Sequence, residues 1–476
     1  MKVTILKLSI SVIITLMAAV NTFAQTELKG KVIDFINYTP IQDASVYILN
    51  TTVGTITNSD GKFELQVPAK SLNDTLVISS IGYKNFKVLV SEYDSAEEIF
   101  LTEDVASLDE VIISSEPRPT TGNDIVLKAI SKLEKNMPDS SYVQKGFLRH
   151  KERNEKEYKW LIESAITVYD SSYAANRDYL KVNVDENRKS YDLRDIDSLF
   201  VYASYLKYVK NQTTRAKDLD RAAISDTELV KAIKWNDERI NGLDNLLKGK
   251  LNLVRNSYKP NALFGKNMLD KHQFKLDTVL VDNERKLYKI QIKESKDFVG
   301  LNTPNIYNEG FNAQGWIYIY WDNYAIKRIE YDLVAASDVQ KKRSKSLYNT
   351  QTNHKLVLAY KEFDEKMYPS YVYYETPKLV NAGDRSSKKA LKEEAELIKE
   401  AEEQFYYTVQ EWLFTEVIQD STEIQKQLQK KWSSDIFLQR PYNAEFWRNY
   451  NVLLESEEEE KLINDLSKRA SLFRED

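Results

Sequence analysis

The feature that most constrains this chain is a series of short segments, over residues 28–113, in which apolar and polar side chains alternate. Turn-forming residues separate the segments, most clearly in the sequences NSDG and SIGY. After the first of these turns, Phe63, Leu65 and Val67 fall on one face of an extended chain. Several short strands at this spacing predict an antiparallel β-sandwich over residues 26–103.

The sequences LKGKVIDF, NSDGKFEL, SSIGY and LDEVII of this stretch resemble the carboxypeptidase-regulatory-like domain, which is transthyretin-like in fold. Many exported envelope proteins of Bacteroidota carry that domain at their N-termini. The resemblance implies an exported protein of this group with an uncharacterised C-terminal domain. Because the domain is an accessory module of receptors, transporters and proteins of unknown role, it does not define a chemistry.

The first residues have the pattern of a secretory signal peptide. Lys2 and Lys7 precede an apolar run at residues 8–20, and Ala24 is a small residue near its end. The run is shorter than the ~20 apolar residues that a membrane-spanning helix needs. We therefore expect a signal peptide at residues 1–24 and a mature protein in the periplasm or at the inner face of the outer membrane.

The chain contains no cysteine, which excludes disulfides, thiolate metal sites, cysteine nucleophiles and a lipid anchor on an N-terminal cysteine. The net charge is −5, and removal of the two lysines of the leader lowers it to −7. A mildly acidic chain with mixed charges offers no electrostatic basis for binding nucleic acid.

Residues 104–122 are expected to form a linker, since the stretch from Ser114 is rich in Pro, Ser and Thr. We expect few contacts across it. The remainder, residues 123–476, is predicted to be an α+β domain of unknown function. It begins with a helix capped by Asn123 or Asp124 and ending near residue 136. Strands follow at 142–149 and 158–169, and residues 190–257 have a mostly helical pattern.

Three consecutive hairpins are predicted next, with turns at residues 282–283, 322–323 and 364–366. They indicate a curved antiparallel meander, so the fold class of the whole chain is α+β. The sequence GWIYIYWDNYAIKRIEY resembles strands of the lipoprotein-carrier half-barrel, in which a sheet wraps around a helix. That resemblance covers about a hundred residues.

One strand of this meander carries Trp316, Tyr318 and Tyr320 on one face and Ile317 and Ile319 on the other. A strand that is apolar on both faces is buried between layers or lines a ligand groove. We interpret it as core, and a groove formed by the three aromatic residues is the alternative.

The C-terminal part adds three elements. Residues 388–404 form a charged helical run, interpreted as a solvated helix, and a strand is expected at 405–417. The aromatic tail at 440–451 resembles the ending of a Bacteroidota family of uncharacterised proteins with the same N-terminal domain. We expect this tail to pack onto its own domain, and a partner-binding patch is the alternative.

No catalytic or metal-binding constellation is visible. A zinc carboxypeptidase needs His-x-x-Glu, and the third residue after His150, His272 and His354 is Arg153, Lys275 and Val357. We expect surface or half-buried roles for all three histidines. A nucleophile elbow is absent, and the glycines before Lys62 are misspaced for a phosphate loop. We read Gly61 as a hairpin residue with positive φ. No catalytic, cofactor or metal residue is therefore assigned.

The sequence favours a non-enzymatic binding or scaffolding protein of the cell envelope, with an envelope protein, glycan or lipid as partner. The second hypothesis is a periplasmic carrier that holds an apolar or lipid ligand in the half-barrel, at Trp316, Tyr318 and Tyr320. The third is a hydrolase of envelope polymers. The chain has many carboxylates that could serve as a catalytic pair, but the sequence does not mark any pair over the others.

Overall fold

The computed structural model describes residues 25–469 except 96–97, 105–117, 154–157, 175, 177–178, 192–197, 216–217, 250, 302–308, 349–352, 380–404 and 439. The expected signal peptide and the charged run at 388–404 lie outside the described residues. Among the described helices, none is long and apolar enough to cross a membrane.

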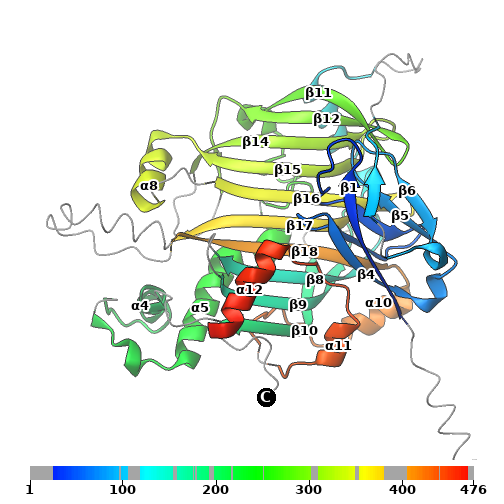
Figure 1. Ribbon diagram of the computed structural model, residues 1–476. Helices are drawn as coiled ribbons and strands as arrows, with labels where there is room; N and C mark the ends of the chain where they lie inside the picture. Colours follow the sequence, from blue (N-terminus) through cyan, green and yellow to red (C-terminus); the bar gives the residue numbers. More distant parts are fainter. Residues whose placement is uncertain are drawn as a thin grey trace, which may run out of the picture.

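The N-terminal part is a small β-sandwich of two sheets, with strand orders β4-β1-β7 and β3-β2-β5-β6 (Figure 1). Its elements are β1 (Gln25–Asp34), β2 (Ser45–Ile48), β3 (Gly54–Ile56), β4 (Lys62–Pro68), η2 (Ala69–Ser71), β5 (Thr75–Ser79), β6 (Phe86–Leu89), η3 (Val90–Glu92) and β7 (Glu98–Leu101).

Alternation along these strands builds the sandwich core. Phe63, Leu65 and Val67 are each at most 1% exposed and belong to one apolar cluster shared by both sheets, as the sequence predicted. Pairing is antiparallel except between β1 and β7, which run parallel. Gly61 has φ +73°, and a Cβ there would lie 2.4 Å from the Val32 carbonyl oxygen, so this turn requires glycine.

The larger part is built on a curved sheet of 11 strands, in the order β10-β9-β8-β18-β17-β16-β15-β14-β12-β11, with β13 paired to β14. The strands are β8 (Tyr142–Arg153), β9 (Tyr158–Asp170), β10 (Leu180–Tyr191), β11 (His272–Asp282), β12 (Arg285–Glu294), β13 (Val299–Gly300), β14 (Glu309–Tyr320), β15 (Ile326–Ala335), β16 (Asn353–Phe363), β17 (Lys366–Leu379) and β18 (Phe405–Ile418). The described pairs are all antiparallel. Together with the helices below, this is the expected α+β class.

The described helices are mostly short. They are α2 (Gly122–Ser131), α3 (Leu133–Asn136), α4 (Ser198–Val209), η5 (Arg221–Ala223), α5 (Asp226–Asn241), α6 (Leu243–Lys248), α7 (Met268–Lys271), α8 (Asp338–Tyr348), α10 (Ser421–Leu428), α11 (Ala444–Arg448) and α12 (Glu457–Arg469). One face of the sheet packs on α2, α3, α5 and α6 and on residues 251–268, where the main apolar core forms. We call this the helix face.

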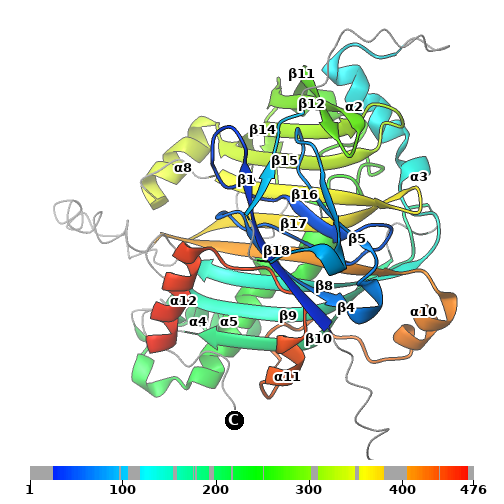
Figure 2. The same ribbon diagram turned by 45° about the vertical axis from the view of Figure 1, so that its right-hand side comes forward.

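The opposite face carries the sandwich and residues 440–469, which we call the C-terminal segment, and we call this face the sandwich face (Figure 2). Here Trp447 and Leu453 of that segment pack on Phe147 and Leu413 of the sheet. The aromatic tail therefore covers its own domain, as expected. Successive residues of each strand point to opposite faces, so one set of strands supplies both surfaces.

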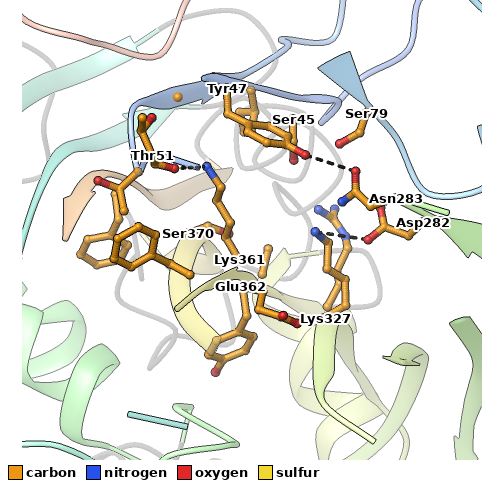
Figure 3. Close-up of a pocket in the computed structure, with 18 of the residues that line it drawn as sticks. Ser45, Tyr47, Thr51, Ser79, Asp282, Asn283, Lys327, Lys361, Glu362 and Ser370 are labelled. Atoms are coloured by element: carbon orange, nitrogen blue, oxygen red, sulfur yellow. Dashed lines mark hydrogen bonds and ion pairs between the residues drawn. The ribbon is translucent and has the colours of Figure 1, made fainter. Parts of the chain in front are cut away.

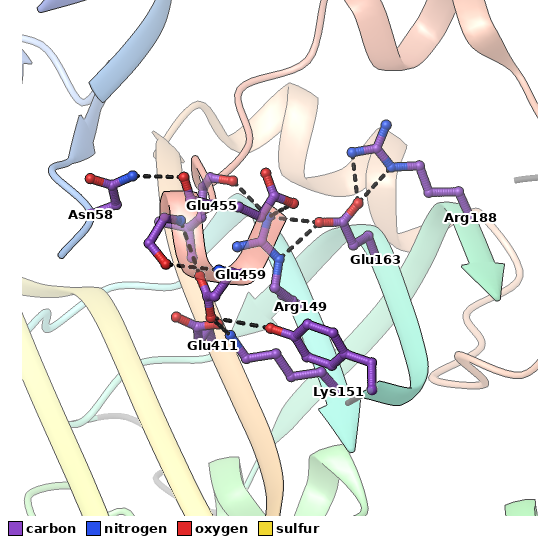
Figure 4. Close-up of polar contacts among 11 residues, drawn as sticks. Asn58, Arg149, Lys151, Glu163, Arg188, Glu411, Glu455 and Glu459 are labelled. Atoms are coloured by element: carbon purple, nitrogen blue, oxygen red, sulfur yellow. Dashed lines mark hydrogen bonds and ion pairs between the residues drawn. The ribbon is translucent and has the colours of Figure 1, made fainter. Parts of the chain in front are cut away.

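A network of buried charges joins the C-terminal segment to the sandwich face (Figure 4). Arg149, only 2% exposed, donates to Glu163 at 2.9 Å and to Glu455 at 2.7 Å. Lys151 contacts Glu459 of α12 at 2.5 Å. These ion pairs satisfy charges that would otherwise be buried unpaired.

The same segment also holds the sandwich, which contradicts our expectation of few contacts between the two parts. The Asn58 amide donates to the Glu455 carbonyl at 2.7 Å. The Gln66 backbone amide donates to the Asn451 side chain at 2.7 Å, and that side chain donates back to the Gln66 carbonyl at 3.1 Å. The composition of a linker describes the linker alone and not the surfaces of the parts it joins.

The hairpins of the meander are confirmed. At the first turn both Asn283 and Glu284 have positive φ, and at the third Asp364 and Glu365 do, as two-residue hairpin turns require. Strand β10 was not predicted. The first helix is capped by Thr121, whose hydroxyl accepts from the amide of residue 124, rather than by residue 123 or 124.

Candidate functional site

A cavity of about 640 Å³ lies where the sandwich meets the large sheet, and we call it the interdomain pocket (Figure 3). Strands β2, β3 and β5 of the sandwich form one side. The other side is formed by the β11–β12 turn and by strands β14 to β18. The pocket exists only because the two parts are held together.

Tyr47 of β2 covers the pocket from the sandwich side. Alternation in β2 buries Val46 and Ile48 in the sandwich core and directs Ser45 and Tyr47 outward. The Tyr47 hydroxyl donates to the Asn283 side chain at 3.2 Å. Burial, and then the Asp282 carboxylate, raise the pKa of Tyr47 to about 12, so the hydroxyl stays protonated and neutral.

The β11–β12 turn forms one wall. Asp282, 2% exposed, accepts a hydrogen bond from the Tyr320 hydroxyl and lies 3.5 Å from Lys327 Nζ. Next to it, the positive φ of Asn283 turns its side chain toward the sandwich, where the amide of Asn85 also donates to it at 2.7 Å. A local turn motif thus becomes a contact between the two parts.

Lys361 of β16 forms the facing wall. Its ammonium group donates to the Thr51 carbonyl at 3.0 Å and lies 4.1 Å from the centre of the Tyr47 ring. Burial, and then the neighbouring Lys327 ammonium, lower the pKa of Lys361 to about 7. The side chain is half-buried and reaches across to the sandwich from the sheet.

The two arginines of the pocket are occupied by carboxylates. Arg328 contacts Asp43 at 2.6 Å and Glu330 at 2.7 Å. Arg285 contacts Asp322 and Glu362 in the same way.

From the sequence we interpret Trp316, Tyr318 and Tyr320 as core, with a groove as the alternative. Tyr318 and Tyr320 are buried in an apolar cluster that Trp316 packs against, and the three residues do not line this pocket together. Tyr320 lines the interdomain pocket and is 2% exposed, with its hydroxyl bound to Asp282. Tyr318 is 9% exposed, and the Lys289 ammonium lies 4.2 Å from the Trp316 ring centre. Trp316 and Tyr318 do not line this pocket.

The histidines differ from expectation. His150 and His272 are both fully buried rather than surface or half-buried, and only His354 is half-buried. His272 bonds to the Met268 carbonyl and to the Tyr331 hydroxyl, and His150 lies 3.1 Å from Asp237. Among the described residues, no group of three or more His, Asp or Glu side chains could hold a metal ion.

Sequence reasoning missed Tyr47, Asn283, Lys327 and Lys361 as a group. One local signal existed: in β16, alternation places Lys361 on the same face as the small or apolar residues Val357 and Ala359. A lysine that continues such a stripe has its charge near a buried surface. Nothing local indicates that residues so far apart in the chain share one cavity.

The comparisons with known proteins support the N-terminal prediction. A family of CarboxypepD_reg-like domains matches residues 28–113, which confirms that domain. No curated protein matches the chain.

Several solved structures show weak likeness. A DUF1329 family protein from Desulfovibrio piger has TM-score 0.25 and 10% identity, covering 63% of this chain and 92% of its own. A putative outer membrane lipoprotein-sorting protein domain from Vibrio parahaemolyticus has TM-score 0.22 and 8% identity, covering 65% and 100%. A LolA superfamily protein from Nitrosomonas europaea has TM-score 0.20 and 8% identity, covering 64% and 95%. TM-scores this low carry no conclusion about ligand or role.

Proposed function

We propose that this chain is a non-enzymatic binding protein of the cell envelope, and that its ligand occupies the interdomain pocket. The observation that carries the proposal is the pocket itself, about 640 Å³ in volume and lined by hydroxyl, amide and charged side chains from both parts of the molecule. A cavity of this size with a few convergent polar groups is typical of small-molecule sites. The predicted signal peptide supports a location in the periplasm or at the inner face of the outer membrane.

The protonation and pairing of the phenols and of Asp282 in the pocket support a binding role. Burial and the Asp282 carboxylate raise the pKa of Tyr47 and of Tyr320, and burial raises the pKa of Tyr360, so these phenols of the pocket stay protonated. Asp282 is held by Tyr320 and Lys327. Such groups position a ligand by donating and accepting hydrogen bonds.

The carrier hypothesis requires an apolar cavity on the helix face. A cavity between Tyr142, Tyr360 and Leu247 there measures about 40 Å³. This is close to the ~30 Å³ that one water molecule occupies in the liquid and is far too small for an acyl chain. This cavity would therefore have to widen before it could hold a lipid.

The proposal can be tested with a fluorophore, because a chain without cysteine accepts a single reporter thiol cleanly. Leu49→Cys places the label at the exposed rim of the pocket. Leu72→Cys is the matched control, another exposed leucine of the sandwich that does not line the pocket. We expect water-soluble sugars or sugar acids to change the fluorescence of the first protein only.

Nuclear magnetic resonance of the ligand after prolonged incubation checks the non-enzymatic part. An unchanged ligand is expected. Conversion to a product would contradict it, and a response confined to fatty-acyl compounds would favour the carrier hypothesis instead.

A further inference from the structure

The lysine and arginine side chains of the interdomain pocket differ in whether a carboxylate lies within ion-pair distance. Arg285, Lys327 and Arg328 each have at least one carboxylate at 3.5 Å or less. Lys361 has none within ion-pair distance among the described residues. Asp364 and Glu365 line the exposed rim, and neither forms an ion pair with it.

The surroundings of Lys361 accept only some of the hydrogen bonds that its ammonium group can donate. It has three N–H donors, and the Thr51 carbonyl takes one of them. The Tyr47 ring adds a cation–π contact, which offsets only part of the loss of hydration. Lys327 lies close enough to repel it, since both charges are of the same sign.

Figure 3 shows how these groups are arranged around the pocket. Lys361 and Lys327 rise from neighbouring strands of the sheet on either side of the space below the Tyr47 ring. Ser45 and Ser370 lie near the same space and offer hydroxyl groups. An anionic group placed there would meet an ammonium without a carboxylate, and hydroxyls on the same ligand would meet the serines.

We propose that the interdomain pocket binds a small hydroxyl-bearing anion, with a carboxylate or phosphate bound by Lys361 and the remainder of the ligand lying against Tyr47. This rests on the proposed function and names its ligand class. A neutral sugar would leave the Lys361 charge uncompensated, and a cation would add to the repulsion between Lys361 and Lys327.

The alternative is a purely structural role for Lys361, in which its hydrogen bond to Thr51 joins the sheet to the sandwich. We call this the strut role, and it makes different predictions. A strut contributes to stability whether or not a ligand is present. A half-buried ammonium with no carboxylate instead opposes folding, so its removal should leave the melting temperature unchanged or raise it.

The experiment is titration of the full mature chain with glucuronate, glucose 1-phosphate and methyl glucoside, read by the Leu49→Cys label. We expect the two anions to bind and the neutral sugar to bind much more weakly. Lys361→Gln should weaken anion binding about 10- to 100-fold, which corresponds to one charge-assisted hydrogen bond. Lys361→Arg should restore part of it. Lys355→Gln, an exposed lysine earlier in the same strand, is the matched control and should bind as the unchanged protein does.

The pH dependence gives a second readout that a strut would not move. The titratable and charged groups around the pocket come from both parts of the molecule: Asp43 before β2, Tyr47 of β2, Asp282 of β11, Arg285 of β12, Tyr320 of β14, Lys327 and Arg328 of β15, Tyr360 and Glu362 of β16, and Asp364 and Glu365 of the β16–β17 turn. Glucuronate stays ionised between about pH 6 and about pH 9. Because the anion needs the protonated lysine, its affinity should fall as the pH rises through this window, and Lys361→Gln should abolish the fall.

The outcomes separate the two proposals. Equal binding of methyl glucoside and glucuronate, with Lys361→Gln unchanged, overturns the anion inference and leaves the proposed function in place. No response of the Leu49→Cys label to any of the three compounds overturns both. Loss of anion binding together with a large fall in melting temperature in both Lys361→Gln and Lys361→Met would assign Lys361 to the strut role and overturn the inference.

Discussion

The two faces of the large sheet come from the same strands and have opposite chemistry. On the helix face, Leu148, Trp160 and Trp412 are fully buried in the main apolar core. On the sandwich face of the same strand β8, Arg149 pairs with Glu455 and Lys151 pairs with Glu459, both of the C-terminal segment. The helix face holds the sheet together by burial, whereas the sandwich face joins separate segments by directed contacts and leaves a pocket between them.

The largest effect should come from the helix face. Trp412→Ala removes a side chain that is 0% exposed and leaves a cavity in the main core, which we expect to destabilise the protein by about 3–5 kcal/mol. Denaturant unfolding followed by circular dichroism measures this. Glu416→Ala, at an exposed position in the same strand, is the control and should change little. A cost below about 1 kcal/mol would mean that this core is loosely packed.

Breaking the charged network of the sandwich face should lower the free energy of unfolding by a comparable or slightly smaller amount, for a different reason. Arg149→Met keeps the apolar volume but leaves Glu163, 1% exposed, with Arg188 as its remaining partner. We expect a loss of about 2–4 kcal/mol. Adding Glu163→Gln to Arg149→Met should recover part of it, because the second change removes a buried carboxylate that has lost one of its two arginine partners. Simple additivity of the two losses would show that Arg149 and Glu163 are not energetically coupled.

As the pH falls, the contacts of the sandwich face should lose stabilising free energy before those of the helix face do. Burial raises the pKa of Glu459, but Lys151 and Arg149 lower it more, and the value falls to about 2. In the unfolded chain a glutamate titrates near pH ~4.3. The stabilisation by Glu459 is therefore complete above that pH and is lost as the pH falls toward 2, by about 1–3 kcal/mol.

Burial raises the pKa of Glu455, which opposes part of this loss. Unfolding curves measured between about pH 5 and about pH 2.5 test the difference, and Glu459→Gln should flatten the dependence. An unchanged slope in that variant would contradict the assignment.

The smallest effect should come from the exposed ion pair between the sandwich and α12. Lys62 and Glu457 lie 2.7 Å apart but are 40% and 66% exposed. Water and salt screen such a pair, so Lys62→Gln should leave the melting temperature unchanged within error. A clear loss would show that the pair holds the two parts together, beyond the Asn58 and Asn451 contacts.

The sequence predicted those parts of the fold whose signals are local. The hairpin turns at Asn283 and Asp364 combine turn-forming residues with alternation on both sides, and each is found where expected. Strand β10 was missed because a bulge after Val184 interrupts its alternation. Its Asn187 is buried against the carbonyls of Ile436 and Leu438, which no nearby residue reveals.

The candidate site was less predictable for the same reason. Tyr47 and Asn283 are joined by a hydrogen bond although 236 positions separate them in sequence. Lys361 and Thr51 are 310 positions apart. Charge and alternation indicate which side chains point away from a core. Which distant segment contacts those side chains depends on how whole segments dock.

The position of β18 in the sheet has a consequence for the order of folding. Strand β8 pairs with β9 on one side and with β18 on the other, and β18 is the described strand that links β8 to β17. Until residues 405–418 leave the ribosome or the export channel, β8–β10 and β11–β17 are two separate sheets with open edges. Pairing across so long a stretch of chain is slow, and open edges invite association with other chains. The unfinished chain is therefore the form most in need of a chaperone.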